Sequence, residues 1–567
     1  MAATQTKDRP EIARNGNSLT LALAQLNPVM GDVAGNLQRA VNARSRAAAL
    51  GADLLVLPEM YLSGYPCDDL LLRADFMEQI SSTVEKLAEI TSDGGPAILL
   101  GAPVAEGGQI FNSAFLLDGG VVLARRDKVQ LPNYGVFDEK RHFTAGQLAG
   151  PVPFRGVRLG LAICEDIWSE DVCETLAESG AEIILSINAS PFEQKKTDAR
   201  AAHVAARVVE TGLPFIYLNM VGGQDELVFD GHSFALNTGG QLAAQLPGFT
   251  EALSVLTASK GASGWQLQGQ ISKPGEATAA LYSAVMTGLR DYVEKNGFPG
   301  VVLGLSGGID SALVAVLAVD ALGPERVRLV MMPSRYTADI STEDAAQLAE
   351  NLGVQLETIP IAEGMAAFDV MLAEAFAGQQ PDVAEENLQS RLRGALLMAL
   401  SNKFGQMVLA TGNKSEYAAG YATLYGDMCG GYAPLKDLWK TQVFDLCRWR
   451  NQALPRAGFG PDRAVIPERI ITRPPSAELR ADQQDTDSLP PYDILDPILI
   501  ALTEEMADID SITARGYDRD VVARASQLLF RAEYKRFQAA PGPKLSARAF
   551  GRDRRLPLTS GFRPDKQ

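Results

Sequence analysis

The chain has 567 residues, of which 46% are hydrophobic and 21% are charged, and its formal net charge is −17. This length exceeds what one core organises, so we expect two or more globular domains. The negative charge argues against a nucleic-acid partner, because phosphates would be repelled. It still allows a small anionic ligand in a local basic pocket.

The remaining composition excludes several classes of protein. Five scattered cysteines without a CxxC pair indicate neither a disulfide framework nor a zinc ribbon, and three histidines without HExxH argue against imidazole-based metal catalysis. Residues 1–18 are polar and lack the apolar core of a signal peptide. The most apolar long stretch, 301–322, contains Asp310 and Asp320 and cannot be a membrane span. We therefore expect a cytoplasmic protein with no membrane partner.

The first half alternates short apolar runs with helical patterns, which predicts a layered α/β domain. Strands are expected at residues 19–26, 54–57, 97–100, 114–117, 158–163, 183–187 and 215–218. Helices are expected at residues 36–50 and 199–211. From about residue 237 the pattern weakens into Gly-, Ser- and Gln-containing sequence, and we expect a linker at 246–277.

A second α/β unit follows the expected linker. Strands are expected at residues 301–305, 327–332 and 407–411. Helices are expected at residues 310–322 and 387–403, the second with leucines at four-residue spacing. Residues 473–497 are rich in Pro and Asp, and sequence alone favours neither an ordered lid nor a mobile loop.

A serine- and glycine-rich turn joins the first strand of this unit to its first helix. Glycines let backbone N–H groups approach an anion at the positive N-terminus of the helix. Serine hydroxyls add donors, and the aspartate could hold Mg²⁺ against phosphates. A plain connecting turn would explain a lone GxGG about as well. The turn consists of Gly304, Leu305, Ser306, Gly307, Gly308, Ile309, Asp310 and Ser311.

The SGGxDS pattern at 306–311 is more specific, and it resembles the pyrophosphate loop of the N-type ATP pyrophosphatases. Members of that class cleave ATP to AMP and pyrophosphate and activate a substrate oxygen as an adenylate. The resemblance implies that the turn binds the β- and γ-phosphates of ATP, with Mg²⁺ as the metal ion. It also accounts for the missing lysine of the GxxxxGK[ST] pattern.

Two further motifs resemble NAD synthetases, which amidate deamido-NAD. They are ATGNKSE at 410–416 and PLKDLWKT at 434–441. Besides the turn, the resemblance implies that ATP is contacted by Thr411, Lys440 and Ser476. It also implies a Mg²⁺ site at Asp310 and Glu416. Taken singly, Lys440 is better explained as part of a solvated helix face.

The resemblance also implies contacts to deamido-NAD. They would come from Asn387, Arg391, Glu416 and Lys535. Arg391 alone is better explained as a helix surface residue. One position departs from the pattern: the short, ammonia-dependent synthetases carry a lysine where this chain has Leu424. Another group must therefore supply that positive charge.

An adenylated carboxylate becomes an amide only when ammonia attacks it, and free ammonia is scarce at neutral pH. A fused ammonia generator would supply it. Cys164 ends the expected strand 158–163, where a nucleophile would be exposed beside a turn and would need a base or a positive neighbour. Glu59 and Lys128 follow other strand ends. An isolated cysteine on an apolar strand is more commonly a core residue.

The set Glu59, Lys128 and Cys164 resembles the Glu-Lys-Cys triad of the nitrilase superfamily of C–N hydrolases. The resemblance implies a four-layer α/β/β/α sandwich at residues 19–245, followed by a Rossmann-like parallel α/β domain of the ATP pyrophosphatase type at 278–567. Glu59 would be the general base, Cys164 would form a thioester and Lys128 would stabilise the oxyanion. Glu139 matches the second glutamate of that superfamily.

Together the two motif sets resemble the glutamine-dependent NAD synthetases. In that family, matching positions hold the glutamine head group, and here they are Tyr134, Glu165, Ser190 and Lys196. The resemblance implies a homo-oligomer, a dimer of synthetase domains with an octamer as one outcome, and an ammonia tunnel. Other amidotransferases, a tRNA-thiolating enzyme and a nucleotide-regulated amidohydrolase are the alternatives. The other amidotransferases would need a Cys-His-Glu glutaminase or an N-terminal cysteine, and a tRNA-thiolating enzyme would need a basic face and often paired cysteines. A nucleotide-regulated amidohydrolase would not need the intact phosphate turn at 306–311.

Overall fold

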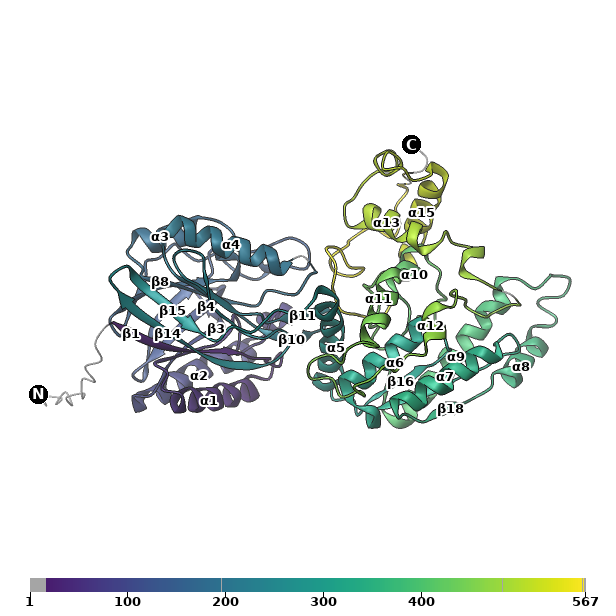
Figure 1. Cartoon of the computed structure of the whole chain (residues 1–567), viewed down its shortest axis with the longest axis horizontal. Coiled ribbons are helices and arrows are strands. Elements are labelled where there is room, and N and C mark those ends of the chain that lie inside the picture. The colour runs from purple at the N-terminus through teal and green to yellow at the C-terminus, as the bar shows by residue number, and fades with distance from the viewer. Residues whose placement is uncertain (1–16, 195, 482, 563, 565–567) are drawn as a thin grey trace, which may run out of the picture.

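The computed structural model describes residues 17–194, 196–481, 483–562 and 564, and it has two lobes (Figure 1). Two mixed β-sheets form the centre of the N-terminal lobe. The seven-stranded sheet has the order β15-β14-β1-β2-β3-β4-β5. Its strands are β1 (Ser18–Gln25), β2 (Leu54–Val56), β3 (Ala97–Glu106), β4 (Gln109–Asp118), β5 (Val121–Asp127), β14 (Ala252–Gly261) and β15 (Gly264–Gly269).

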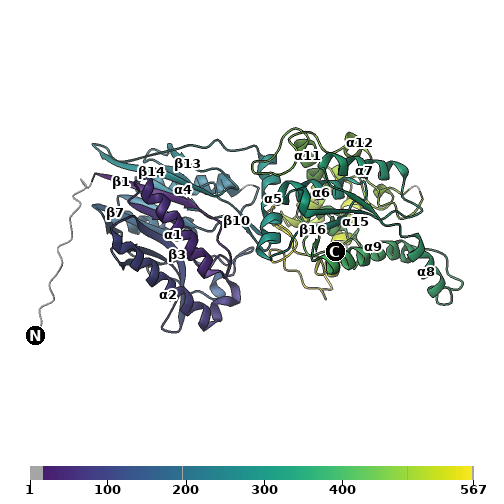
Figure 2. The ribbon, with the colours of Figure 1, turned by 90° about the horizontal axis from the view of Figure 1, so that it is seen from below.

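The second sheet of this lobe has six strands in the order β13-β12-β9-β8-β7-β6. They are β6 (Val152–Phe154), β7 (Val157–Ile163), β8 (Ile183–Asn188), β9 (Phe215–Asn219), β12 (Phe234–Leu236) and β13 (Leu242–Gln245). Helices cover both outer faces (Figure 1). They are α1 (Val33–Ala49) and α2 (Ala74–Ile90) on one side, and α3 (Asp171–Glu178) and α4 (Lys196–Thr211) on the other. Figure 2, seen from below, looks onto the face covered by α1 and α2.

Alternation along the strands decides which residues face which layer. On β1, Leu21 and Leu23 share a core with Leu161 and Ile163 of β7, between the two sheets. The intervening Ala22 of β1 packs instead toward the helices α1 and α2. The four-layer α/β/β/α arrangement expected from the sequence is thereby confirmed.

The expected linker at 246–277 is wrong over most of its length. Strand β14 pairs antiparallel with β1 along the whole of β1, and β15 pairs with β14. Both strands therefore belong to the sandwich. They were missed because β14 is polar at many positions and exposed toward its end, so it lacks the apolar run of a central strand. Only residues 270–276 connect the lobes, followed by α5 (Ala277–Lys295).

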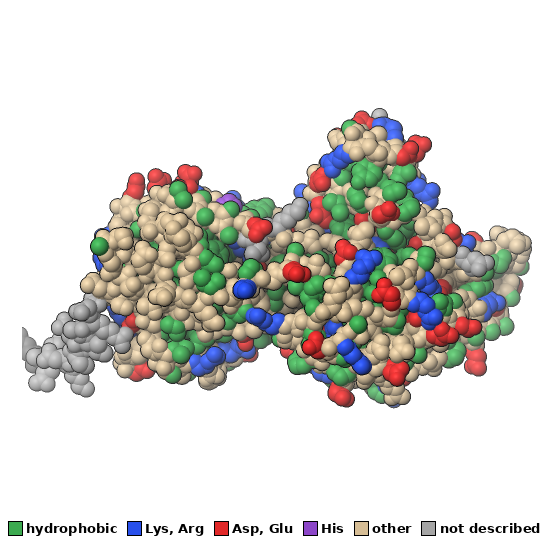
Figure 3. Space-filling model, viewed as in Figure 1, with side chains coloured by type: hydrophobic (Ala, Val, Ile, Leu, Met, Phe, Trp, Pro, Cys, Tyr) green, Lys and Arg blue, Asp and Glu red, His purple; other side chains and the backbone are tan. Residues whose placement is uncertain are grey.

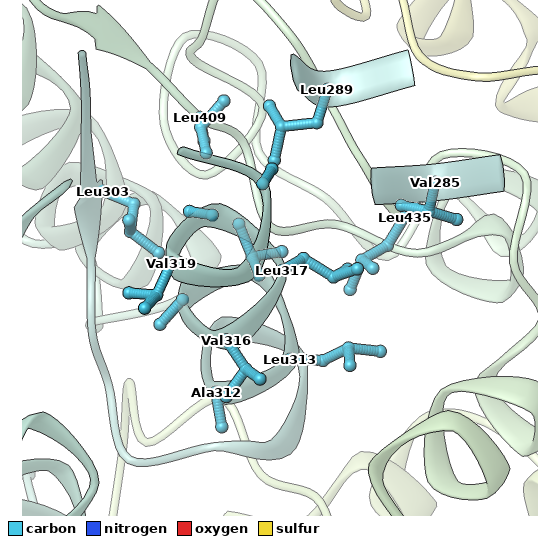
Figure 4. Packing of buried hydrophobic residues seen from close by; sticks show 14 of the residues in the cluster. Val285, Leu289, Leu303, Ala312, Leu313, Val316, Leu317, Val319, Leu409 and Leu435 are labelled. Carbon is cyan, nitrogen blue, oxygen red and sulfur yellow. The ribbon is translucent and has the colours of Figure 1, made fainter. Parts of the chain in front are cut away.

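The C-terminal lobe is built on a four-stranded parallel sheet of order β18-β17-β16-β19. Its strands are β16 (Val301–Gly304), β17 (Val327–Met331), β18 (Leu356–Thr358) and β19 (Met407–Val408). The central helix α6 (Ile309–Leu322) is apolar on all sides, because it packs between this sheet, α5 and the segment carrying Leu435. Figure 4 shows Leu313, Val316 and Leu317 of α6 within that core.

The remaining helices surround this core, and those near the C-terminus form a smaller upper part with its own apolar cluster (Figure 1). They are α7 (Asp339–Leu352), α8 (Ala362–Leu372), α9 (Val383–Phe404), α10 (Lys414–Ala419), α11 (Lys440–Arg450), α12 (Glu468–Thr472), α13 (Tyr492–Thr503), α14 (Ile509–Thr513), α15 (Arg519–Arg531) and α16 (Glu533–Arg536). On the face in Figure 3, acidic and basic side chains of this lobe are interspersed. Among the described helices, none is long and apolar enough to cross a membrane.

Candidate active sites

Three charged side chains meet inside the N-terminal lobe. Glu59 follows β2, Lys128 follows β5, and Glu139 begins the turn Glu139–Arg141. The Nζ atom of Lys128 lies 2.9 Å from Glu59 Oε1 and 2.8 Å from Glu139 Oε1. Each of the three residues is at most 4% exposed. Two carboxylates thus hold one ammonium group in a site shielded from water.

Uncharged groups from distant segments complete this cluster. The amide of Asn112 donates to Glu59 Oε1 at 2.8 Å, and the backbone N–H of Ala189 donates to Glu59 Oε2 at 2.7 Å. The hydroxyl of Tyr65 donates to Glu139 Oε1 at 2.9 Å. Sequence reasoning missed all three, since no local motif marks a residue whose partner lies 53 to 130 positions away.

Cys164 begins a short turn at the end of β7, and its φ of +46° is unusual for a residue with a side chain. Asp166 holds this turn in place. Its Oδ2 accepts from the N–H of Ile163 at 3.0 Å, and its Oδ1 accepts from Val129 and Gln130 at 2.9 and 2.8 Å. The residues after Lys128 are therefore tied directly to the turn that carries Cys164.

Burial controls the ionisation of this site. It raises the pKa of the Cys164 thiol well above the usual range, the charge of Glu59 adds to this, and Lys128 opposes it. Burial also raises the pKa of Glu139 to about 7. For Lys128, burial lowers the pKa, but Glu139 and Glu59 together hold it well above its ordinary value. The resting thiol is therefore protonated beside a permanent cation, and it requires a base to become a nucleophile.

The predicted contacts to an amino-acid head group lie around the Cys164 turn. The hydroxyl of Tyr134 donates to Glu165 Oε1 at 2.9 Å. The Nζ of Lys196 lies 5.0 Å from the ring centroid of Phe137 and 5.8 Å from that of Trp168. One acidic group, Glu165, and one basic group, Lys196, therefore lie near the Cys164 thiol.

Ser190, the fourth predicted contact, is buried just beyond the end of β8. Its hydroxyl accepts a hydrogen bond from Arg200 Nε at 3.1 Å. Burial and, after it, the charge of Arg200 lower the pKa of Lys196 to about 8. Arg200 is a residue that sequence reasoning did not select.

The serine- and glycine-rich turn of the C-terminal lobe connects β16 to α6, as predicted. Gly307 has a φ of +83°, and a Cβ there would lie 2.2 Å from the carbonyl oxygen of Ser341. The Oγ atoms of Ser306 and Ser311 lie 3.0 Å apart, and the N–H of Gly308 donates to Ser306 Oγ at 3.2 Å. The turn is therefore preformed, with its hydroxyls gathered at the N-terminus of α6.

Asp310 and Glu416 approach one lysine beside this turn. Lys440 Nζ is hydrogen-bonded to Asp310 Oδ2 and lies 3.6 Å from Glu416 Oε1. Asn413 Nδ2 donates to Asp310 Oδ1 at 2.9 Å. Burial, then the charge of Asp310, raises the pKa of Glu416 to about 8, and Asp485 acts in the same direction. This excess of negative charge fits a divalent cation that takes few carboxylates together with phosphate oxygens.

A cavity of about 280 Å³ opens above this turn. All the predicted ATP contacts line it: the turn itself, Thr411, Lys440 and Ser476, together with Glu416. Its cover is the segment 473–479, where Arg473 and Glu478 both bond the hydroxyl of Ser341 on α7. This part of the Pro- and Asp-rich segment is therefore an ordered cover, while its end enters α13; residue 482 lies outside the described residues.

Comparisons with known proteins match both lobes. A family model described as carbon-nitrogen hydrolase matches residues 20–263, and one described as NAD synthase matches residues 281–539. The glutamine-dependent NAD(+) synthetase of Rhodobacter capsulatus is 50% identical over 544 residues, which cover 96% of this chain and 98% of that protein. The chain belongs to the glutamine-dependent NAD(+) synthetase family.

Solved structures of this synthetase family share the arrangement. A structure from Acinetobacter baumannii in complex with adenosine diphosphate is 42% identical and has a TM-score of 0.77, covering 96% of this chain and 99% of that one. A glutamine-dependent NAD(+) synthetase from Cytophaga hutchinsonii, 23% identical, shares the fold with a TM-score of 0.79. The predicted fold class, a nitrilase-like sandwich followed by a parallel α/β synthetase domain, is confirmed.

Three of the predicted deamido-NAD contacts form hydrogen bonds with one loop, residues 420–424, and do not themselves line the cavity. Asn387 Oδ1 accepts from the hydroxyl of Thr423 at 2.8 Å, and Arg391 Nε donates to the carbonyl of Leu424 at 3.2 Å. Lys535 Nζ donates to the carbonyls of Gly420 and Ala422 at 2.8 Å each. Two cations therefore flank the loop at the position where Leu424 replaces a lysine.

The two domains of the synthetase meet at α5 and the hairpin of β10 (Val221–Gln224) and β11 (Leu227–Asp230). Asp291 Oδ2 of α5 accepts from Asn27 Nδ2 and from the N–H of Gly223, at 2.6 Å each. A second cavity, of about 260 Å³, lies at this boundary, and its lining includes Pro66, Val136, Tyr292 and Lys544.

Proposed function

We propose that the two sites act as one enzyme, which amidates deamido-NAD to NAD with ATP and takes the nitrogen from L-glutamine. The synthetase family to which the chain belongs catalyses ATP-dependent amidation with glutamine. The observation that supports this most strongly in the molecule itself is the buried contact of Lys128 with Glu59 and Glu139, whose charges act on the Cys164 thiol. Such a site suits amide hydrolysis, and the preformed phosphate turn in the same chain suits the use of its ammonia.

In the N-terminal domain, Glu59 takes the proton of the Cys164 thiol as the sulfur attacks the amide carbon of glutamine. The carbonyl oxygen becomes an oxyanion beside the ammonium group of Lys128, which stabilises it electrostatically. The C–N bond then breaks, the nitrogen receives the proton from Glu59, and ammonia leaves a thioester on Cys164. Water activated by Glu59 hydrolyses the thioester to glutamate, while Glu139 keeps Lys128 in position.

The head group of glutamine is bound by charge. Its ammonium group faces the Glu165 carboxylate, which the Tyr134 hydroxyl orients. Its carboxylate faces Lys196 and Ser190 on the opposite side. The opposed charges of an amino acid thus determine the orientation in which the side-chain amide reaches Cys164.

In the C-terminal domain, the turn from Gly304 to Ser311 binds the β- and γ-phosphates of ATP at the N-terminus of α6. Asp310 and Glu416 would hold Mg²⁺, which would neutralise charge on the departing pyrophosphate. The nicotinate carboxylate attacks the α-phosphorus, pyrophosphate leaves, and ammonia then displaces AMP from the adenylate. Lys440, beside both carboxylates, offsets part of their negative charge and lies where the triphosphate would bind.

Deamido-NAD would lie against the loop 420–424. Arg391 and Lys535 would supply the positive charge that Leu424 does not, since both already bond carbonyls of this loop. Asn387 would complete this side, and Glu416 would lie where the substrate meets ATP.

Ammonia would pass between the domains without entering bulk water. The cavity at the domain boundary supports this, because it is lined by Pro66 and Val136, near Tyr65 and Tyr134 of the first site, and by Tyr292 and Lys544 of the second domain. We also propose that the enzyme is a homo-oligomer, with paired synthetase domains.

The substitution Cys164→Ala tests the division of labour. It should abolish NAD formation with glutamine and leave NAD formation with high ammonium largely intact, because the phosphate turn lies in the other domain. Cys173→Ala, a change to a buried cysteine on α3, is the matched control and should support both reactions. A folded Cys164→Ala enzyme that also fails with ammonium would refute the proposal.

A further inference from the structure

Arg200 is a fully buried arginine that the proposed chemistry leaves without a role. It lies on α4, four residues after Lys196, so both side chains leave the same face of the helix. Its side chain is 2% exposed, and its charge is balanced by Asp230, whose Oδ1 lies 2.7 Å from Arg200 NH1. A buried ion pair contributes little net stability on average, so stability alone does not explain why the Arg200–Asp230 pair lies beside the glutamine pocket.

The other nitrogens of Arg200 all contact one short segment. Nε donates to Ser190 Oγ at 3.1 Å, and NH2 donates to the carbonyls of Ser190 and Pro191 at 2.9 and 2.6 Å. Asn219 holds Ser190 from the far side, because its Oδ1 accepts from the Ser190 N–H at 2.9 Å and its Nδ2 donates to the Ser190 carbonyl at 3.1 Å. Backbone and hydroxyl oxygen of Ser190 are thereby fixed together.

The chemistry of the guanidinium group gives this contact a direction. Arginine carries only N–H donors and no acceptor, so Ser190 Oγ must accept in the bond to Arg200. The hydroxyl of Ser190 must then donate its own proton, to the neighbouring Tyr217 hydroxyl in the free site and to a substrate group when one is bound. A substrate ammonium group cannot accept that proton, whereas a carboxylate can. Arg200 therefore suits Ser190 to the carboxylate end of an amino acid, on the same side as Lys196.

We propose that Arg200 is a positioning residue that makes the glutaminase site selective for amides bearing an α-carboxylate, by fixing Ser190 as a donor to that group. This inference rests on the proposed function, because it assumes that the Cys164 site takes glutamine. Asp230 keeps Arg200 charged in the buried site, and His232 Nδ1, 3.1 Å from Asp230 Oδ2, bonds the second carboxylate oxygen.

Kinetics of the full-length Arg200→Lys enzyme test this, since lysine retains the charge but cannot bond Ser190 and Asp230 in the same fork. The KM for glutamine should rise by about 10- to 100-fold, the range of a lost hydrogen bond to a charged group, with a smaller change in kcat. Inhibition by 4-aminobutanamide, which has the ammonium and amide but no α-carboxylate, should stay near the wild-type value. Alkylation of Cys164 by iodoacetamide should also be unchanged.

Arg207→Lys is the matched control, because Arg207 is buried on the same helix but pairs with Glu210 at 2.6 Å. It should leave the KM for glutamine within about 2-fold of wild type. If Arg200→Lys fails to fold, Ser190→Ala provides the same test: it should raise the KM for glutamine without changing inhibition by 4-aminobutanamide. In the double variant Arg200→Lys/Ser190→Ala, the two effects should not multiply.

Two results would overturn the inference. One is an equal loss of affinity for glutamine and 4-aminobutanamide in Arg200→Lys or Ser190→Ala, which would indicate general damage to the site. The other is a wild-type KM for glutamine in either variant. A wild-type protein that hydrolyses no glutamine would instead defeat the proposed function, so the two failures are distinguishable.

Discussion

Replacing Glu139 by Gln probes the charge balance around Lys128 with little change of shape. A glutamine at this position can still accept from Lys128 and from the Tyr65 hydroxyl, which lie 2.8 and 2.9 Å from Glu139 Oε1. The cluster would then hold one cation and one carboxylate, so Lys128 would pair more tightly with Glu59. A general base bound more tightly to a cation is a weaker base toward the Cys164 thiol.

The size of the expected loss in activity follows from the hydrogen bond between Lys128 and residue 139, because its acceptor becomes a neutral amide in Glu139→Gln. A hydrogen bond between two charged groups contributes about 1 to 2 kcal/mol more than one to a neutral amide. If this free energy is lost from the transition state, kcat/KM for glutamine falls by about 5- to 30-fold. The reaction with ammonium should be unaffected, because the cluster lies in the other domain.

Glu139→Gln should also change how the free energy of unfolding depends on pH. The pKa of Glu139 is raised from 4.5 to about 7, so the folded protein holds this proton more tightly than the unfolded chain. The stability from that proton is fully present below about pH 4.5 and is lost as the pH rises through about 7. Glu139→Gln should therefore lose less stability than wild type across this window.

Two assays decide the matter: steady-state glutaminase kinetics, and urea unfolding at several pH values from 4.5 to 7.5, the upper limit being about half a unit above the pKa of Glu139. Glu106→Gln is the control, because Glu106 is an exposed carboxylate paired with Arg125 at 2.7 Å. It should match wild type in both assays. A Glu139→Gln enzyme with wild-type kcat/KM, or with a stability–pH curve that superimposes on that of wild type, would rule out this role of the Glu139 charge.

Three further predictions concern the C-terminal domain. Asp310→Asn should slow deamido-NAD-dependent pyrophosphate release by about 100-fold or more, and near-normal release would remove Asp310 from the metal site. Gly307→Ala should raise the KM for ATP, since its new Cβ would lie 2.2 Å from the Ser341 carbonyl at a φ of +83°; an unchanged KM would mean that the turn adapts. Asp320→Asn should cost about 3–5 kcal/mol in urea unfolding, because Arg450 would keep a buried charge without its partner, and a loss below about 1 kcal/mol would contradict this.

The positions of the reactive residues could be predicted because they follow the ends of apolar strands. Glu59 and Cys164 follow the apolar runs 54–57 and 158–163, and the phosphate turn lies between a strand and a helix with clear patterns. Lys128 is the exception, because it follows the exposed or half-buried strand β5, which was not expected, and it was selected through the resemblance to the nitrilase superfamily. Local sequence is informative where a reactive group follows a strongly buried strand.

The residues that support these groups could not be predicted. Tyr65 and Asn112 contact Glu139 and Glu59 only in the folded protein. In the sequence, nothing distinguishes Arg200 from the other charged residues of its helix, although its Nε bonds Ser190 in the structure. Strand β14 was missed because a strand with one exposed, polar side lacks a continuous apolar run. In each case the decisive partner is far away in the chain.

The fate of the glutamine nitrogen shows whether ammonia released at the first site reaches the second site. Wild-type enzyme would convert deamido-NAD with ATP, Mg²⁺ and amide-¹⁵N-labelled glutamine in the presence of excess unlabelled ammonium, and mass spectrometry would give the ¹⁵N fraction of the NAD formed. If ammonia passes directly from the first site to the second, the NAD is mostly labelled, and glutamate and NAD are produced in nearly equal amounts. NAD carrying only the ¹⁵N fraction of the bulk ammonium would contradict this direct passage.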